Sequence, residues 1–188
     1  MKIYLLDKNE KMVESWNRFF KDDPSVKVVN NDFESFMKNN DVECVVSPAN
    51  SFGLMDGGYD LAISNYFGDD LQKKVQKYII KNFNGEQPVG TAFMLKIPNT
   101  NKRLIHAPTM RNPGLIKDPL VVYFAMRETL RIAEKNKVES IVIPAFGALT
   151  GGVHRDTVAK YMNVAFKEYN NKPEKGMSWK YASRRNDI

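Results

Sequence analysis

Two glycine-containing loops carry the residue types that suit phosphate binding. They span 47–60 and 144–153, and their glycines are Gly53, Gly57, Gly58, Gly147, Gly151 and Gly152. Each loop follows an apolar run typical of a strand and precedes a helical pattern. Glycine lets backbone amides come close to a phosphate, and the helix that follows adds the positive end of its dipole. Because ligands of open α/β sheets bind beyond the carboxyl ends of the strands, the two loops can hold a diphosphate between them.

The alternative is that these glycines serve only tight turns. Neither loop ends in Gly-Lys-Ser/Thr, so neither is a Walker A loop. Neither contains G-x-G-x-x-G, which disfavours a Rossmann dinucleotide site. The spacing of the glycines therefore favours a phosphate-binding crevice without choosing its ligand.

The elements that must position the loops follow from the hydrophobic pattern. We expect strands over 2–6, 26–29, 42–47, 92–97, 103–107 and 140–144. We expect helices over 10–20, 33–38, 69–83, 119–135 and 154–169, and one that begins near Tyr59. The polar turn between 92–97 and 103–107 indicates a hairpin. The alternation predicts an α/β protein: a three-layer α/β/α sandwich with a central mixed, mostly parallel sheet.

Length and composition place both loops in one globular domain. The 188 residues are 43% hydrophobic and 27% charged, as in ordinary soluble proteins. No apolar run approaches the roughly 18 residues of a membrane span, and the N-terminal apolar stretch stops at Asp7, too early for a signal peptide. Cys44 is the single cysteine, and no Cys/His cluster predicts a metal site. We therefore expect a cytoplasmic protein with no metal, no cofactor and no membrane partner.

Positive charge is concentrated near the C-terminus. The chain has a formal net charge of +6. In 171–188, Glu174 and Asp187 face five basic residues, which are Lys172, Lys175, Lys180, Arg184 and Arg185. We predict a single domain over 1–170 followed by a basic segment over 171–188. That segment is either a solvated terminus or a contact for nucleic acid.

Motifs in and around the loops resemble those of the macro domain family, which binds ADP-ribose. Asp32 stands where the family has the aspartate of its Gly-Asp-Ile motif. The second loop is similar to the family variant Pro-Gly-Leu-Gly-Thr-Gly-Val-Gly-Gly. The resemblance covers 26–169. Its other motifs are Ser47-Pro48-Ala49-Asn50 for the family's Asn-Ala-Ala-Asn, Gly57-Gly58-Tyr59-Asp60-Leu61-Ala62-Ile63 for its glycine run and helix start, and Ile105-His106-Ala107 for its strand end.

Three departures from the family pattern fall in the loops. Ser47 replaces an asparagine, and Asp56 replaces a glycine and brings a carboxylate near the expected diphosphate. Ala148 and Leu149 stand where the variant has Thr-Gly, so Leu149 has a Cβ where a close amide contact favours glycine. We expect these departures to affect affinity more than fold.

The resemblance implies a role for each matching position. Asp32 accepts a hydrogen bond from the adenine amino group, with Phe33 beside it, and Asn50 contacts the hydroxyls of the distal ribose. The backbone amides of Gly57, Gly58 and Tyr59 meet the phosphate next to that ribose. The second loop closes over the diphosphate through Phe146, Gly147, Ala148, Leu149, Thr150, Gly151 and Gly152. The alternatives are a helix cap for Asp32 and a turn residue for Asn50.

Asp60 decides between a binding module and an enzyme. In the hydrolytic macro domains that the chain resembles, an aspartate at this position is credited with activating water for attack at the anomeric carbon of the distal ribose. Binding-only relatives often carry alanine there. The resemblance thus implies that Asn50 and Asp60 are catalytic and that the substrate is an ADP-ribosyl ester or related bond, on protein or as O-acetyl-ADP-ribose. The alternative is that Asp60 only stabilises the first turn of a helix.

Two other functions stay open. The first is a non-catalytic module that binds ADP-ribose or a related nucleotide. The second is a nucleic-acid-associated protein that uses the basic segment over 171–188, and ADP-ribosylated nucleic acid as substrate would combine both ideas. The sequence leaves the oligomeric state undetermined.

Other candidate side chains have simpler interpretations. His106 closes an apolar strand and His154 begins a helix, so both favour structural roles. Arg111 fits an exposed loop better than an anion site at the rim of the crevice. Trp179 and Tyr181 are candidates to stack on adenine, with ordinary packing as the alternative.

Overall fold

The computed structural model describes residues 1–173, 176–183 and 185. Six strands form one sheet in the order β2-β1-β6-β3-β5-β4. Neighbouring strands are parallel, except that β4 runs antiparallel to β5. The strands are β1 (Lys2–Asp7), β2 (Val26–Asn30), β3 (Cys44–Ser47), β4 (Phe93–Lys96), β5 (Arg103–His106) and β6 (Ser140–Ile143).

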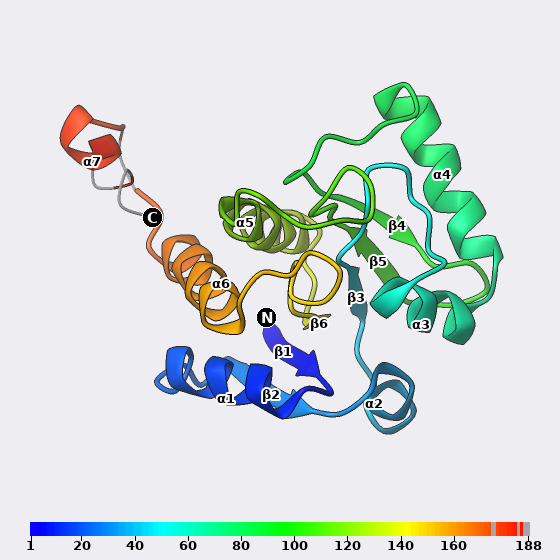
Figure 1. The fold of residues 1–188 in the computed structure, drawn as a ribbon, viewed down its shortest axis with the longest axis horizontal. Coiled ribbons are helices and arrows are strands. Elements are labelled where there is room, and N and C mark those ends of the chain that lie inside the picture. Colours follow the sequence, from blue (N-terminus) through cyan, green and yellow to red (C-terminus); the bar gives the residue numbers. More distant parts are fainter. Residues whose placement is uncertain (174–175, 184, 186–188) are drawn as a thin grey trace.

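Helices cover both faces of the sheet (Figure 1). One face packs against α1 (Glu10–Phe19), α5 (Leu120–Lys135) and α6 (Arg155–Asn170). The other packs against α2 (Phe33–Asn39), α3 (Gly58–Phe67) and α4 (Asp70–Phe83). A short helix, α7 (Trp179–Ser183), lies beyond the far end of α6. Within the described ranges, every helix is too short or too polar to span a bilayer.

Side chains that alternate along each strand divide the core in two. On β1, Ile3 and Leu5 join the core beneath α1, α5 and α6, whereas Tyr4 and Leu6 join the core beneath α2, α3 and α4. All four are buried. A strand covered on both faces must be apolar at successive positions, which explains the continuous apolar runs of the sequence.

The predicted fold class is confirmed. The sheet lies between two helical layers, and it is mixed because of one antiparallel edge strand. The expected hairpin is also confirmed, since Phe93 pairs with His106 and Lys96 with Arg103. The predicted strands and helices are found within a few residues of their expected bounds. The pattern did not predict α7, because a five-residue helix is too short to show a hydrophobic period.

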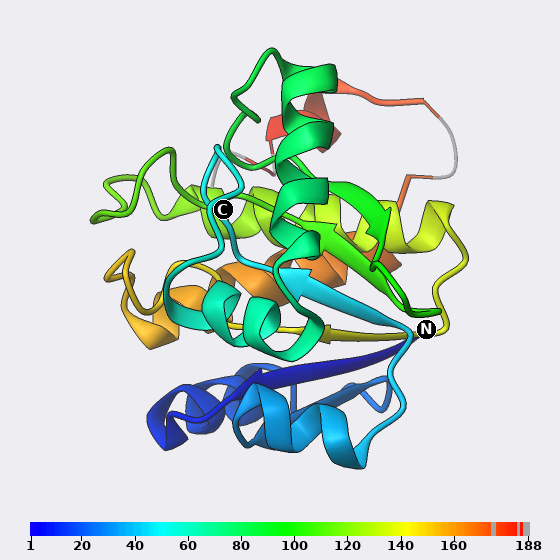
Figure 2. The same cartoon turned by 90° about the vertical axis from the view of Figure 1, so that its right-hand side faces the viewer.

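Parallel strands bring the candidate loops to one edge of the sheet. In Figure 2 the loops after β3, β5 and β6 lie on the left, opposite the N-terminus of the chain. Because β1, β2, β3, β5 and β6 all run in one direction, their carboxyl ends share this edge. The candidate site therefore has to be sought there.

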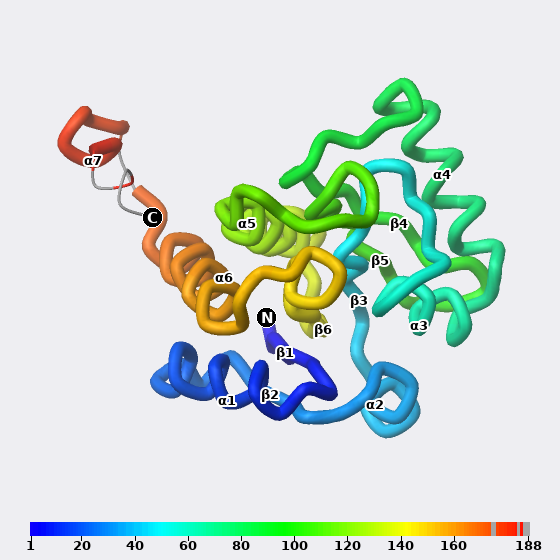
Figure 3. Tube along the Cα trace, viewed as in Figure 1, coloured from blue at the N-terminus to red at the C-terminus, as the bar shows by residue number. Residues whose placement is uncertain are grey.

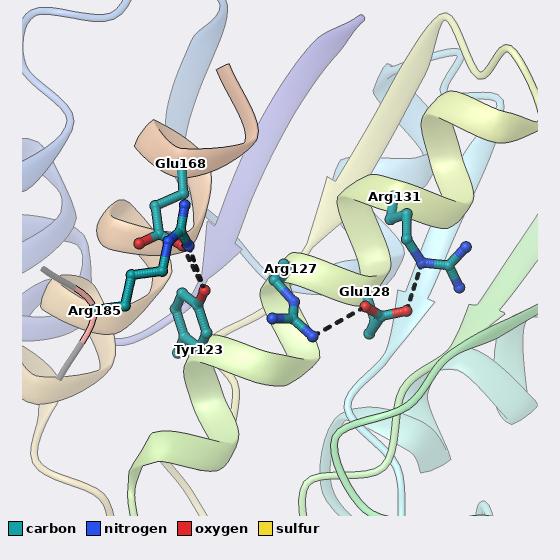
Figure 4. A network of polar contacts seen from close by, with 6 residues as sticks. All are labelled: Tyr123, Arg127, Glu128, Arg131, Glu168 and Arg185. Atoms are coloured by element: carbon teal, nitrogen blue, oxygen red, sulfur yellow. Dashed lines mark hydrogen bonds and ion pairs between the residues drawn. The ribbon is translucent and has the colours of Figure 1, made fainter. Parts of the chain in front are cut away.

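The described part of the C-terminal segment is tied to α5 and α6 by polar contacts (Figure 4). Arg185 donates hydrogen bonds to Glu168 and, at 3.3 Å, to the hydroxyl of Tyr123. That hydroxyl donates to Glu168 as well. Farther along α5, Arg131 Nε donates to Glu128 at 2.6 Å. These contacts lie near the carboxyl end of α6, whereas the loop edge of the sheet lies at its amino end.

Candidate functional site

Three loops meet at the carboxyl edge of the sheet, and Figure 3 shows them side by side. The loop after β3 joins the loop after β5, because Ser51 N donates to Met110 O at 3.1 Å. The loop after β5 joins the loop after β6, because Ile116 N donates to Gly151 O at 2.9 Å. The two glycine-containing loops also approach each other directly: Leu149 Cδ2 lies 3.6 Å from where a Cβ on Gly58 would be.

A cavity of about 590 Å³ opens between these loops. Its walls come from the carboxyl ends of β1, β2, β3, β5 and β6 and from the first residues of the helices that follow. The cavity is large enough for a nucleotide-sized ligand. The sequence-predicted residues that line it are Asp32, Phe33, Asn50, Gly57, Gly58, Tyr59, Asp60, Gly147, Ala148, Leu149, Thr150 and Gly151.

The amino terminus of α3 faces this cavity. Gly57 is its N-cap and supplies no side chain to satisfy the first amides of the helix. Gly58 has φ +56°, a left-handed conformation in which a side chain would be strained. Free amides at a helix start, together with its dipole, make a binding place for an anion.

The second loop obtains its shape from Gly147 and Gly152, with φ of +70° and +64°. Leu149 does not have a positive φ, so the leucine in place of glycine costs no backbone strain. Its side chain is 76% exposed and reaches across toward Gly58. A Cβ on Gly151 would come within 2.5 Å of Gly147 O, so that position has room only for glycine.

Asp60 lies at the floor of the cavity, in the first turn of α3. Its side chain is 8% exposed, and Ser47 Oγ donates a hydrogen bond to Asp60 Oδ1 at 2.7 Å. Burial raises the pKa of Asp60 to about 7, although the bond from Ser47 opposes this shift, and the nearby charge of Asp56 adds to it. A carboxyl group with a pKa near neutrality can exchange protons at physiological pH.

Asn50 shapes its own loop. Its Nδ2 donates to Leu54 O at 2.7 Å, and its Oδ1 accepts from the amides of Phe52 and Leu54 at 3.1 and 3.3 Å. The turn interpretation of this residue is therefore confirmed. An amide nitrogen has two hydrogens, so one remains available to a ligand in the cavity.

Asp32 is both a helix cap and part of the cavity wall. Its Oδ1 accepts a hydrogen bond from Ser35 N at 2.8 Å, and this bond holds the pKa of the carboxyl below its usual range. Next to it, Phe33 is buried and packs edge-on against Tyr59 at a ring-centroid distance of 5.3 Å. The capping interpretation is confirmed, and the second carboxylate oxygen stays free to accept.

The Macro domain family model matches residues 46–162. The chain belongs to the macro domain family. This macro domain is 34% identical over 124 residues to an uncharacterised protein of Aquifex aeolicus, covering 65% of this chain and 71% of the relative. It is 31% identical over 122 residues to an Escherichia fergusonii protein named O-acetyl-ADP-ribose deacetylase, covering 63% and 67%. The predicted family is thus confirmed.

Solved macro domains share the fold at lower sequence identity. The Oceanobacillus iheyensis macrodomain with ADP superposes with a TM-score of 0.61 at 21% identity, over 78% of this chain and 82% of that one. The macrodomain of Mycobacterium tuberculosis DarG superposes with a TM-score of 0.59 at 20% identity, over 69% and 84%. At these identities the likeness speaks for the architecture of the macro domain.

Two predicted contact residues of this macro domain do not line the cavity. Phe146 is fully buried in the core with α5 and α6, so its side chain supports the loop from below. Gly152 faces Leu115 on the outer side of the loop. The side chain of Phe146 is therefore not part of the cavity wall, and contact of this loop's backbone with a ligand stays a prediction.

The sequence also left part of the cavity wall unnoticed. Lys8 and Lys11 follow β1, Arg155 begins α6, and Thr109 and Met110 follow β5. Ser47 was recognised only as a departure, yet it holds Asp60. The topology could have indicated these residues. The carboxyl ends of all parallel strands face the crevice, so the residues after β1 and β5 are candidates for its wall.

The histidines have structural roles, as expected. His106 is fully buried, and its Nδ1 lies 2.7 Å from Gln87 Oε1. Burial lowers the pKa of His106 to about 3, so the ring is neutral. His154 is the N-cap of α6 and accepts from Asp156 N at 3.3 Å. Within the described residues, no group of three His, Cys, Asp or Glu side chains is placed to hold a metal ion.

The remaining candidates lie away from the cavity. Arg111 pairs with Glu86 through two hydrogen bonds of 2.6 and 2.9 Å and is an exposed loop arginine, as expected. Tyr181 accepts a hydrogen bond from Arg185, beside Glu168. Glu168 lies near the carboxyl end of α6, and the cavity lies at its amino end. Neither Trp179 nor Tyr181 therefore stacks on a ligand in the cavity of the same chain.

Proposed function

We propose that this macro domain binds ADP-ribose and hydrolyses an ADP-ribosyl ester or a related bond. The observation that carries the proposal is the buried carboxyl of Asp60, held by Ser47 in the wall of a cavity between two glycine-containing loops. The name of the E. fergusonii relative and the ADP-ribose bound in an O. iheyensis macrodomain variant support the same ligand. ADP-ribosylated protein and O-acetyl-ADP-ribose are the proposed substrates.

In this proposal the diphosphate lies against the start of α3 and the loop of 146–151. The adenine lies beside Asp32, and the distal ribose lies beside Asn50 and Asp60. The free hydrogen on Asn50 Nδ2 donates to a ribose hydroxyl. Amide donors on both sides of the diphosphate replace the water that it loses on binding.

Asp60 acts as the general base. Its carboxylate takes a proton from a water molecule as the water oxygen bonds to the anomeric carbon of the distal ribose. For an ADP-ribosylated carboxylate, the bond from that carbon to the carrier oxygen breaks, and the carrier leaves as a carboxylate. The same negative charge stabilises the positive charge that develops on the sugar. For O-acetyl-ADP-ribose, the water oxygen bonds instead to the acetyl carbonyl carbon, the acyl C–O bond breaks, and the ribose oxygen leaves with the proton that Asp60 has taken. Ser47 orients the carboxylate through its hydrogen bond.

Asp60→Ala is expected to separate hydrolysis from binding. Turnover of a mono-ADP-ribosylated protein should fall about 100-fold or more, because positioned acid–base groups contribute factors of this size. The affinity for ADP-ribose, measured by calorimetry, should change much less. Asp69→Asn, at the N-cap of α4 and outside the cavity lining, is the control and should behave as the wild type. Unchanged turnover in Asp60→Ala would remove Asp60 from the mechanism.

A non-catalytic binding module is the second candidate, favoured by the loop-building role of Asn50. Calorimetric titration with ADP-ribose, AMP, ADP and NAD tests the pocket itself. A clear preference for ADP-ribose supports both candidates, and comparable weak binding of all four rejects both. Binding without turnover over ester-linked and phosphate-linked substrates would select the module.

A further inference from the structure

The cavity has a cationic section that the proposed contacts with ADP-ribose do not use. Its positively charged side chains are Lys8, Lys11 and Arg155. The two lysines are exposed and Arg155 is half-buried. None of the three pairs within 4.0 Å with a carboxylate of the described residues.

The acidic residue that could neutralise this section is engaged elsewhere. Asp156 follows Arg155, but its Oδ1 accepts from Ser15 Oγ at 2.6 Å and pairs with Arg18. The bond from Ser15 to Asp156 holds α1 to the start of α6, and Ser15 also donates to Lys11 O within α1 at 3.0 Å. Asp7 also lines this end of the cavity and accepts from Asn9 N at 2.8 Å; burial raises its pKa, and the adjacent charge of Lys8 opposes that shift. Asp32 and Asp56 line other parts of the cavity.

The strand order fixes where this section lies along the ligand. The order is β2-β1-β6-β3, with Asp32 after β2 and Asn50 after β3. If adenine lies at Asp32 and the distal ribose at Asn50, then the adenosine ribose and the diphosphate, which connect them, lie at the ends of β1 and β6. The loop after β6 receives the diphosphate, so the end of β1, with Lys8 and Lys11, lies beside the ribose of the adenosine.

We propose that the cavity recognises ADP-ribose that carries a phosphate ester on the 2′- or 3′-hydroxyl of its adenosine ribose. Lys8, Lys11 and Arg155 would bind this additional phosphate, whose charge at neutral pH is close to −2 in a free monoester and about −1 in a nucleic-acid diester. The inference rests on the ligand orientation of the proposed function and extends it from ADP-ribose to a phosphorylated form. Two sources have this chemistry: a free 2′-phosphorylated nucleotide, or the 3′-linked adenosine of a nucleic acid.

Calorimetry with ADP-ribose and ADP-ribose 2′-phosphate tests the proposal. The wild type should bind the phosphorylated ligand on the order of tenfold more tightly at low salt, and added salt should reduce the difference. The variant Lys8→Ala/Lys11→Ala should bind both ligands about equally. The control Lys77→Ala/Lys81→Ala removes the same charge from the exposed side of α4 and should keep the preference.

Each other outcome has a defined meaning. Equal affinity of the wild type for both ligands overturns the inference but leaves the proposed function intact. If Lys8→Ala/Lys11→Ala loses the same factor of affinity for both ligands, the inference is overturned as well, because the lysines would then bind the diphosphate that both ligands contain. Failure of the wild type to bind either ligand rejects the proposed function together with the inference. Competition by adenosine 2′,5′-bisphosphate and by adenosine 3′,5′-bisphosphate distinguishes the two sources.

Discussion

At the scale of single residues, the proposed chemistry depends mainly on the pair of Ser47 and Asp60. Burial favours the neutral acid, and one hydrogen bond from Ser47 favours the charged base, so the carboxyl titrates at about pH 7. An exposed aspartate with a pKa near 4 would be fully charged but a poor proton acceptor. The departure from the family pattern at position 47 thus supplies the hydrogen bond that holds the Asp60 carboxyl, which is the proposed base.

The pH dependence of hydrolysis follows from this pair. If Asp60 is the base, its unprotonated form is active, so kcat should rise with pH through about 7. In Ser47→Ala the charged form loses a hydrogen bond, its pKa rises further, and the midpoint should move upward by about one pH unit. A pH–rate profile measures both. Ser64→Ala, whose buried hydroxyl has no hydrogen-bond partner, is the control. A wild-type profile that is flat between pH 6 and 8 would contradict this assignment.

At the scale of elements, the turns between strands and helices decide the site. The loop after β6 folds back on itself, and Ile116 from the neighbouring loop covers Gly147 and Gly151. The packing leaves no space at those two positions. The shape of the loop surface that is proposed to face the diphosphate therefore depends on the packing of Ile116 against these glycines.

Gly151→Ala should distort this loop. The new Cβ would meet Gly147 O and the Ile116 side chain, both 2.5 Å away, and relieving such overlap costs about 1–3 kcal/mol. ADP-ribose affinity should fall about tenfold, and the melting temperature by a few degrees. Gly114→Ala is the matched control, because the nearest atom to its new Cβ would be 3.9 Å away. Wild-type affinity in Gly151→Ala would show that the loop does not bind the ligand.

The sequence predicted those parts of the structure that depend on a single periodic pattern of residues. The strands, the helices and the carboxyl-edge crevice followed from apolar periods and glycine placement, and the loop around Asn50 and Asp60 followed from its motif. Side-chain direction within a turn has no period, so the sequence does not show that the Phe146 side chain is buried away from the cavity. The cavity role of Lys8 depends on strand order, and β1 and β6 are far apart in the chain.

At the scale of the whole molecule, the crevice and the basic segment occupy different places. The crevice lies at the amino end of α6, and the described contacts of Arg185 lie near its carboxyl end. The segment contributes to the domain through Tyr123 and Glu168 (Figure 4). A role in nucleic-acid binding would thus act at a distance from the cavity.

Removal of residues 174–188 should leave ADP-ribose binding within about twofold of the full chain, because the described contacts of this segment do not line the cavity. The melting temperature should fall slightly, since the contacts of Arg185 with α5 and α6 are lost. Calorimetry and thermal unfolding measure the two effects. A large loss of ADP-ribose affinity would mean that the segment reaches the ligand. If nucleic acid binds through it, the truncated chain should lose that binding and its salt dependence.

Asn50 has two roles, one in the structure of its own loop and one in the cavity wall, so ligand binding should affect how often the backbone of that loop opens. The Asn50 side chain accepts hydrogen bonds from the amides of Phe52 and Leu54, and the same residue lines the cavity. If a nucleotide binds the Asn50 side chain, the hydrogen bonds from these two amides to Asn50 should open less often. Both amides should therefore exchange with deuterium more slowly in the presence of ADP-ribose. Faster or unchanged exchange would mean that the sugar sits elsewhere.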